Sequence, residues 1–185
     1  LNTDRKNEIY LSFGAITPYK KIDLLIDAFN VNGKKLVIIG DGSEKVKLMK
    51  NANPNIEFKG AMELAKIENI FSRTRALLFP GEEDFGMIPL ELMAYGIPVI
   101  ALKKGGALET VIEDRNDYKE STGLFFEEQN VSSLNNAIEL FEKVENKIDP
   151  EWIRNHALKF REKEFLSNIT MCIDSFLTKK INVFK

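Results

Sequence analysis

Cysteine and histidine are almost absent from this sequence. Its 185 residues include one cysteine, Cys172, and one histidine, His156. A single cysteine cannot form an internal disulfide, and the two residues together supply too few ligands for a cysteine and histidine zinc site. His156 falls in a C-terminal helical pattern, where a structural role is expected, so a histidine-based catalytic triad has no support.

The sequence also lacks the long apolar runs and the strong charge that would indicate a membrane or nucleic-acid protein. No apolar run approaches the roughly 20 residues of a membrane-spanning helix. The net charge is −2, which does not indicate a nucleic-acid-binding surface. The chain begins with Leu1 instead of methionine and shows no signal peptide. We therefore expect a cytoplasmic chain without nucleic-acid partners that is a piece of a longer protein.

Short apolar segments alternate with helical patterns along most of the chain. Apolar residues recur at spacings of three and four between Ile22 and Phe29, as on one face of a helix. The six expected strands are short, apolar and often bounded by glycine or proline, as buried parallel strands are. They are Ile9–Phe13, Leu36–Ile39, Ile56–Phe58, Ala76–Phe79, Pro98–Ala101 and Leu124–Phe126. This alternation predicts an α/β fold with a doubly wound, Rossmann-like parallel sheet.

The strand pattern stops beyond Ile148, and two helical stretches follow, at about residues 150–160 and 163–177. The pair Asp149-Pro150 is typical of a helix cap followed by a first-turn proline. We therefore expect a Rossmann-like domain over residues 1–148. Over residues 149–185 we expect C-terminal helices that pack on it.

Two loops of the expected sheet contain the most unusual local chemistry in the chain. In open α/β sheets a ligand lies at the carboxyl ends of the strands, where the strand order reverses. With the common order 3-2-1-4-5-6, the first and fourth strands are neighbours at that point. The loops that follow them are Gly14–Lys21 and Pro80–Pro89. We expect these two loops to flank the binding site.

The first loop reads GAITPYKK and combines several features of an anion site. Gly14 allows a ligand to approach the backbone closely. Thr17 and Pro18 resemble the cap and first residue of a helix, whose positive end would face the ligand. Lys20 and Lys21 add full positive charge, and the whole suits a diphosphate. The alternative is that both lysines are simply solvated, as most lysines are.

The second loop reads PGEEDFGMIPLE and is rich in carboxylates. We expect a helix to start near Pro89, with Glu91 in its first turn and Glu83 in the loop before it. Carboxylates can accept paired hydrogen bonds from the vicinal hydroxyls of a ribose or hexose. The backbone amides of Phe85–Ile88 could meet an anion at the helix start. The alternative is that Glu91 merely complements the helix dipole.

Two further glycine turns follow other strands. Gly40 and Gly42 begin like a dinucleotide fingerprint, but the third glycine would fall at Lys45. NAD binding is therefore disfavoured, and a glycine turn with Ser43 as the helix cap is the better interpretation. Gly105-Gly106 follows the fifth strand and is either a turn or another amide-rich approach to phosphate.

The order of these segments resembles glycosyltransferase family 4, also called group 1, in its donor-binding domain of GT-B fold. The resemblance extends from about Ile9 to Phe126 and more loosely to the C-terminus. Its most specific motif is Glu83-x7-Glu91. The segments PYKK, EEDFG and GGALETV are similar to bacterial GDP-mannose-dependent mannosyltransferases of polysaccharide and O-antigen lipopolysaccharide synthesis. The matching pieces are FGAITPYKKIDLLIDAF, KLVIIGDGSEKVKLM, PNIEFKGAM, ALLFPGEEDFGMIPLELMAYGIPVIA, GGALETV and STGLFF.

The resemblance implies a role for each residue of the two loops. Lys20 would bind the donor diphosphate and Glu83 the transferred hexose, which makes these two the expected catalytic residues. Glu91 would hold the ribose, and the stretch Gly60–Leu64 would lie by the base. Many members carry arginine where this chain has Ala15, so the second diphosphate cation is missing or is supplied by Lys21. The implied donor-binding residues are Gly14, Lys20, Lys21, Gly60, Met62, Glu83, Phe85, Gly86, Met87, Ile88 and Glu91.

The resemblance also implies a reaction. A retaining, metal-independent enzyme without a cofactor would transfer a hexose from a GDP- or UDP-sugar, GDP-mannose being favoured, to a glycan or lipid-linked acceptor. No Asp-x-Asp motif occurs, in agreement with metal independence. The acceptor would bind an N-terminal domain that this chain lacks and toward which the C-terminal helices would cross, so the chain alone would be inactive. The full-length enzyme would lie peripherally at the inner membrane. The alternative is a non-catalytic nucleotide-binding or regulatory α/β domain.

Overall fold

A single parallel sheet organises the molecule. The structure is a computed structural model that describes residues 8–183, without the side chains of residues 64, 65 and 178–183. The six strands lie in the order β3-β2-β1-β4-β5-β6, and every neighbouring pair is parallel. This confirms the doubly wound parallel sheet. The strands are β1 (Ile9–Phe13), β2 (Leu36–Ile39), β3 (Ile56–Gly60), β4 (Thr74–Phe79), β5 (Val99–Leu102) and β6 (Gly123–Phe126).

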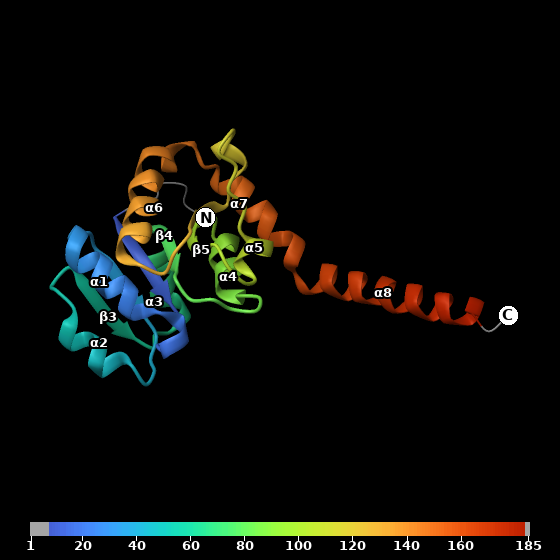
Figure 1. The fold of residues 1–185 in the computed structure, drawn as a ribbon, viewed down its shortest axis with the longest axis horizontal. Coiled ribbons are helices and arrows are strands. Elements are labelled where there is room, and N and C mark those ends of the chain that lie inside the picture. The colour runs from blue at the N-terminus through green and yellow to red at the C-terminus, as the bar shows by residue number, and fades with distance from the viewer. Residues whose placement is uncertain (1–7, 184–185) are drawn as a thin grey trace.

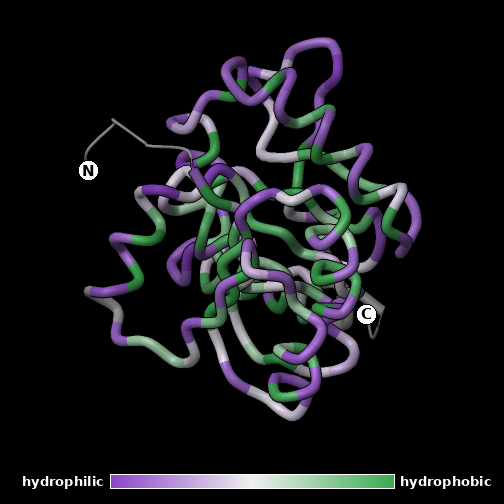
Figure 2. Tube along the Cα trace, turned by 90° about the vertical axis from the view of Figure 1, so that its left-hand side faces the viewer, coloured by the Kyte–Doolittle hydropathy of each residue, from purple (hydrophilic) through white to green (hydrophobic). Residues whose placement is uncertain are grey.

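The sheet is apolar on both faces because helices cover both. All residues of β2 (LVII) and β5 (VIAL) are buried. Crossovers between parallel strands are right-handed in nearly all α/β folds, and here β1 to β2 runs in the opposite direction across the sheet from β4 to β5. The helices of these two connections therefore lie on opposite faces. Figure 2 shows the apolar segments gathered in the centre of the molecule, and each buried valine or leucine stabilises the fold by about 1.5–3 kcal/mol.

Helices fill every connection. The helix α1 packs against α6, and α4 packs against α7. None of the described helices has the length and apolar character needed to cross a bilayer. The α-helices are α1 (Ile22–Asn32), α2 (Lys45–Asn51), α3 (Leu64–Phe71), α4 (Met87–Ala94), α5 (Ala107–Thr110), α6 (Val131–Val144), α7 (Pro150–Ala157) and α8 (Glu162–Val183). The short 3₁₀ helices are η1 (Pro18–Lys20), η2 (Tyr118–Glu120), η3 (Glu145–Lys147) and η4 (Leu158–Phe160).

The two C-terminal helices behave differently. Asp149 caps α7 by accepting a hydrogen bond from the N–H of Glu151, and Ile153 and Ala157 on the same helix are buried. By contrast, every side chain that is described from Phe165 onward along α8 is exposed. Figure 1 shows α8 extending away from the rest of the molecule. Our expectation that both C-terminal helices pack on the domain does not describe α8, because its apolar side chains stay exposed, although Phe165 and Ile169 line a hollow together with Phe85 and Phe160.

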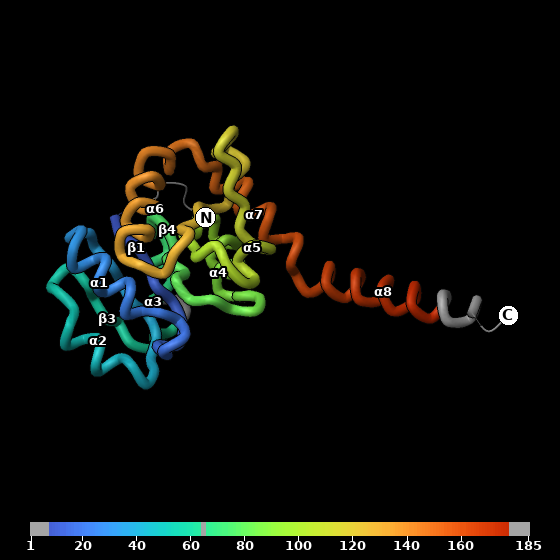
Figure 3. The backbone as a smooth tube through the Cα atoms, in the orientation of Figure 1, coloured from blue at the N-terminus to red at the C-terminus, as the bar shows by residue number. Residues whose placement is uncertain are grey.

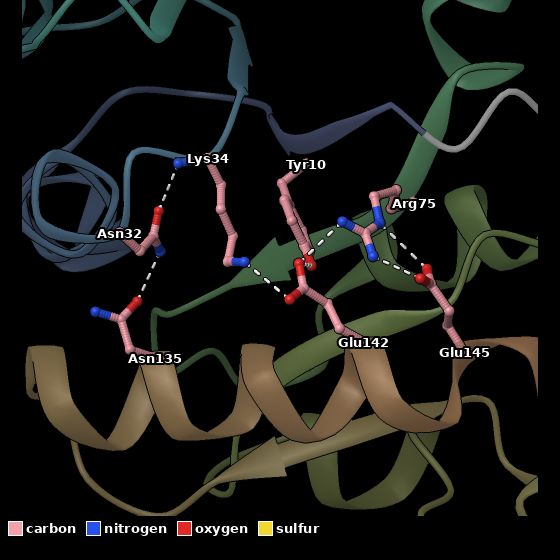
Figure 4. A network of polar contacts seen from close by, with 7 residues as sticks. All are labelled: Tyr10, Asn32, Lys34, Arg75, Asn135, Glu142 and Glu145. Carbon is pink, nitrogen blue, oxygen red and sulfur yellow. Dashed lines mark hydrogen bonds and ion pairs between the residues drawn. The ribbon is translucent and has the colours of Figure 1, made fainter.

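A network of charged side chains connects α6 and η3 to the amino ends of the strands (Figure 4). We call it the amino-edge network. Glu142 accepts from the hydroxyl of Tyr10 at 3.0 Å, from Arg75 at 2.9 Å and from Lys34 at 2.8 Å. Arg75 also donates to both carboxylate oxygens of Glu145, at 2.5 and 3.2 Å. The network joins residues more than a hundred positions apart, such as Tyr10 and Glu142.

Candidate functional site

The loops after the first three strands lie against one another at the carboxyl edge of the sheet. The N–H of Gly14 donates to the carbonyl of Ile39 at 2.9 Å, and the N–H of Gly40 donates to the carbonyl of Gly60 at 3.0 Å. A Cβ atom on Gly40 would lie only 1.8 Å from the carbonyl oxygen of Gly14. Only glycine permits this contact. Gly40 therefore forms a turn that supports the first loop, which is the interpretation we favoured over a dinucleotide fingerprint.

The loops after β1 and β4 are also side by side. A Cβ atom on Gly14 would lie 2.5 Å from the Cδ1 of Ile88 in the first turn of α4, and one on Gly81 would lie 2.8 Å from the carbonyl oxygen of Tyr19. This adjacency follows from the strand order, in which β1 and β4 are neighbours. Sequence reasoning does not single out Gly81, although its place in a Pro-Gly pair was the available signal.

An ion pair between Lys20 and Glu83 bridges these two loops. The Nζ of Lys20 contacts the Oε1 of Glu83, and the two side chains are only 13% and 17% exposed. The same Nζ lies 5.8 Å from the centre of the Phe79 ring and 5.3 Å from that of Tyr19. A partly buried cation beside aromatic rings interacts with an anion more strongly than one in open water. A ligand that displaced Glu83 from Lys20 would have to be anionic, and it would leave the carboxylate to accept hydroxyl hydrogens.

The helix α4 begins earlier than the sequence suggested. We expected it near Pro89, but it starts at Met87, with Gly86 at the cap position in the left-handed region at φ 76°. Pro89 is tolerated as the third helical residue because the first-turn N–H groups have no partner inside the helix. Glu91 therefore lies in the second turn and not the first. The interpretation of Glu91 as a simple complement to the helix dipole is weaker there, since the dipole acts mainly in the first turn.

The side chains around the start of α4 are open to a ligand. Phe85 is 43% exposed and Met87 is 66% exposed. Glu91 is exposed and makes no ion pair or hydrogen bond with any described residue. The carboxyl edge thus presents one carboxylate that is paired with a lysine, Glu83, and one that has no protein partner, Glu91.

The first loop differs from our expectation in its helix. Thr17 and Pro18 begin only the 3₁₀ helix η1, and the side chain of Thr17 makes no cap hydrogen bond. The α-helix begins four residues after Pro18, at Ile22. Between the two, Lys21 adopts left-handed backbone angles, φ 54° and ψ 39°. Its Nζ lies 3.7 Å from Asp23, so the two lysines of the loop contact different carboxylates.

The turn Gly105-Gly106 supports the second loop. The N–H of Gly106 donates to the carbonyl of Glu83 at 2.7 Å. A Cβ atom on Gly105 would lie 2.4 Å from that same carbonyl oxygen, and one on Gly106 would lie 2.4 Å from the Cα of Phe85. We left two interpretations open for this turn, a simple turn or an approach to phosphate. Its contacts in the structure are those of a turn that supports the second loop.

The residues expected near a base lie beside β3. The backbone of Gly60 has φ 70°, and a Cβ atom there would lie 3.5 Å from the Nζ of Lys45. Lys45 pairs with Asp41 at 2.9 Å, and this hydrogen bond lowers the pKa of Asp41. Met62 lines a hollow of about 900 Å³ between β2, β3 and α3. Ser43 does not cap α2, because Glu44 occupies the cap position.

We found no cluster of three or more histidine, cysteine, aspartate or glutamate side chains arranged to hold a metal ion among the described residues. His156 is buried, and its Nε2 lies 2.8 Å from the carbonyl oxygen of Thr110. Because a carbonyl can only accept, that nitrogen carries the proton. Burial lowers the pKa of His156, although the bond to Thr110 opposes this shift.

The sequence of this chain is similar to those of curated glycosyltransferases. Uncharacterized glycosyltransferase MJ1178 of Methanocaldococcus jannaschii is 34% identical over 133 residues, which cover 69% of this chain and 36% of that protein. A GDP-mannose-dependent alpha-mannosyltransferase of Mycolicibacterium smegmatis is 33% identical over 99 residues, 53% of this chain and 26% of that protein. The chain thus spans only about a third or less of the length of these relatives.

A solved structure agrees in fold. The Anabaena protein Alr3699/HepE in complex with UDP superposes with a TM-score of 0.69 at 22% identity, over 94% of this chain and 49% of that one. At this identity the likeness establishes the GT-B half as the fold. The model of the family "Glycosyl transferases group 1" matches residues 1–159, most of the chain. The chain therefore belongs to the group 1 glycosyltransferases, also called glycosyltransferase family 4.

Proposed function

We propose that this chain is the nucleotide-sugar-binding part of a retaining hexosyltransferase. The observation that carries the proposal is the Lys20–Glu83 pair, which joins the two loops at the strand-order reversal. This is the position where open α/β sheets bind their ligands. Membership of the family and the unpaired carboxylate of Glu91 in α4 support the same conclusion.

Each residue has a distinct task in this proposal. Lys20 leaves Glu83 and pairs with the donor diphosphate, which gains negative charge as the sugar departs. Glu83 then accepts hydrogen bonds from the hexose hydroxyls. Glu91 holds the ribose hydroxyls, and the amides at the start of α4, within Phe85–Ile88, donate to the sugar and phosphate.

The donor we favour is GDP-mannose. The relative from Mycolicibacterium smegmatis carries GDP-mannose in its name. The neighbour from Anabaena was solved with UDP, so a uridine nucleotide is the competing donor. The acceptor, a glycan or a lipid-linked sugar, binds a domain outside this chain in our proposal. We therefore expect the chain to bind donor without transferring its sugar.

Thermal unfolding of the purified chain tests the proposal. GDP-mannose or a UDP-sugar at a hundred times its dissociation constant should stabilise the protein by about 2.7 kcal/mol, because it binds only the folded state. NAD and ATP at the same concentration should leave the melting temperature unchanged, and EDTA should not alter the response. A melting temperature that no nucleotide sugar raises contradicts the proposal. An equal rise with ATP would favour the regulatory nucleotide-binding domain instead.

A further inference from the structure

A closed circuit of contacts connects the second loop of the site to the C-terminal segment. The loop, residues 80–86, rests on Gly106 through the hydrogen bond from the N–H of Gly106 to the carbonyl of Glu83. Gly106 precedes α5, and its carbonyl accepts from the hydroxyl of Thr110 at 3.2 Å. The carbonyl of Thr110 accepts in turn from His156 on α7 at 2.8 Å. This half of the circuit consists of hydrogen bonds.

The other half consists of aromatic rings. The ring of His156 packs edge-on against that of Phe160, with centroids 5.3 Å apart. Phe160 lies in η4, and its ring contacts that of Phe85 at a centroid distance of 6.2 Å. Phe85 belongs to the loop from which the circuit began. The loop is therefore contacted by Gly106 through a hydrogen bond and by Phe160 through its ring. His156 is connected to both, through Thr110 and through the ring of Phe160.

Packing in the hydrophobic core does not explain why phenylalanine occupies position 160 and histidine position 156. Phe160 is only partly buried, and Phe85 is 43% exposed. His156 is buried, but its Nδ1 has no hydrogen-bond partner among the described residues. A buried imidazole with one unsatisfied nitrogen costs stability. A leucine would fill similar space without that cost but could not donate to Thr110, so the hydrogen bond is the feature that distinguishes histidine here.

We propose that Phe160 and His156 are positioning residues that hold the Glu83–Gly86 segment in its donor-binding shape. The C-terminal segment 150–160 thus completes the donor site from outside the sheet. The inference rests on the proposed function, since it names residues that act on the same site. It gives the C-terminal segment a task in binding and not only in folding. Helix α8 begins at Glu162, two residues after Phe160, and its Phe165 and Ile169 line one hollow with Phe85 and Phe160. Figure 3 shows α8 continuing the chain beyond α7.

Hydrogen–deuterium exchange of the free protein tests the positioning step without any ligand. Phe160→Ala should raise the exchange of the Gly106 amide, whose hydrogen bond to the carbonyl of Glu83 holds the loop, and Phe160→Tyr should restore protection because it keeps the ring. Leu158→Ala is the matched control, since Leu158 lies in the same turn and is 51% exposed. Unchanged exchange in Phe160→Ala, or an equal rise in Leu158→Ala, overturns the proposal.

Calorimetry of donor binding tests the consequence. Phe160→Ala should weaken nucleotide-sugar binding by about tenfold, within the range for residues coupled through a backbone shift. Binding of the free nucleoside diphosphate should fall by less, because Lys20 does not belong to the circuit. Phe85→Ala should cause a similar loss, and the double variant should lose no more than either single variant. Equal losses for both ligands, or additive losses in the double variant, overturn the proposal.

His156 provides an independent check. The amide of a glutamine can donate to the carbonyl of Thr110, whereas a leucine cannot. His156→Gln should therefore retain loop protection and donor affinity, and His156→Leu should lose both.

Failure of the positioning proposal can be distinguished from failure of the proposed function. If the loop responds in exchange while the wild-type protein binds no nucleotide sugar, the proposed function fails and the positioning contact stands. If the protein binds donor and the loop does not respond, the positioning proposal alone fails.

Discussion

The two edges of the sheet use the same kinds of charged side chains in different ways. At the amino edge, both carboxylate oxygens of Glu142 and both of Glu145 have protein partners. At the carboxyl edge, Glu83 uses one oxygen on Lys20, and Glu91 has no partner among the described residues. In our proposal the saturated carboxylates stabilise the fold, whereas the unsaturated ones bind the ligand. Satisfaction of hydrogen bonds, more than charge, distinguishes the amino edge from the edge that we propose to bind the donor.

The largest effect should come from breaking the amino-edge network. Glu142→Ala leaves Arg75, Lys34 and Tyr10 without their shared acceptor and should lower the free energy of unfolding by about 2–4 kcal/mol, somewhat less than for a fully buried pair. Urea denaturation measures the change. Glu139→Ala, on the exposed face of the same helix, is the control. The affinity for a nucleotide sugar, measured where the variant is still fully folded, should not change. A loss of affinity would show that the two edges are not independent.

Acid should weaken the amino edge specifically. Burial of Glu142 opposes its ionisation, but hydrogen bonds from Lys34 and Tyr10 outweigh burial, so its pKa in the folded state is lowered from the ordinary value of 4.5. The unfolded chain therefore binds the proton more readily, and the stability from this group is present above pH 4.5 and is lost as the pH falls through the folded pKa. Glu142→Gln should flatten the acid limb of a plot of unfolding free energy against pH. An unchanged limb would contradict this assignment.

The next effect should separate binding from stability. Lys20→Ala should weaken GDP or UDP binding by about 1.5–3 kcal/mol, the range for hydrogen bonds to charged groups. It should hardly affect a free nucleoside, which has no diphosphate. Isothermal titration with GDP, UDP, guanosine and uridine measures the affinity for each nucleotide and for its nucleoside. Equal losses for nucleotide and nucleoside would move Lys20 away from the phosphate.

A smaller effect should separate the two glutamates. Glutamine keeps one acceptor oxygen and removes the charge, so each substitution should cost about 1 kcal/mol of binding. Glu91→Gln should weaken free nucleotide and nucleotide sugar alike, because both contain ribose. Glu83→Gln should weaken only the nucleotide sugar. If Glu83→Gln weakens the bare nucleotide as much as Glu91→Gln does, the division of tasks is wrong.

The smallest effect concerns the second lysine of the first loop. Lys21 has φ 54°, a conformation that glycine adopts without strain. Lys21→Gly should raise the free energy of unfolding by about 0.5 kcal/mol, since relief of left-handed strain exceeds the extra entropy of the unfolded chain. Nucleotide affinity should not fall, because Lys21 pairs with Asp23. A clear loss of diphosphate affinity would make Lys21 the second cation of the site.

Local patterns predicted the elements well and their ends less well. The predicted bounds of β1 and β2 match the structure at both ends. The start of α4 was misjudged because proline was interpreted as the first helical residue, whereas Gly86 caps the helix in a left-handed conformation. Thr17 and Pro18 likewise begin a 3₁₀ turn and not α1. Both errors occur where one residue adopts positive φ, which a pattern of apolar residues does not reveal.

The sequence by itself determined the parallel sheet, since buried strands alternating with amphipathic helices admit few other packings, and it pointed to the two loops that the Lys20–Glu83 pair joins. Only the tertiary structure decided which side chains meet across long separations. Examples are Tyr10 with Glu142, and Phe85 with Phe160. It also decided that α8 leaves the domain, because an apolar stripe specifies that a helix needs a partner and not where that partner lies. The physical reason is range: local propensities act over a few residues, whereas these contacts depend on the closure of the whole sheet.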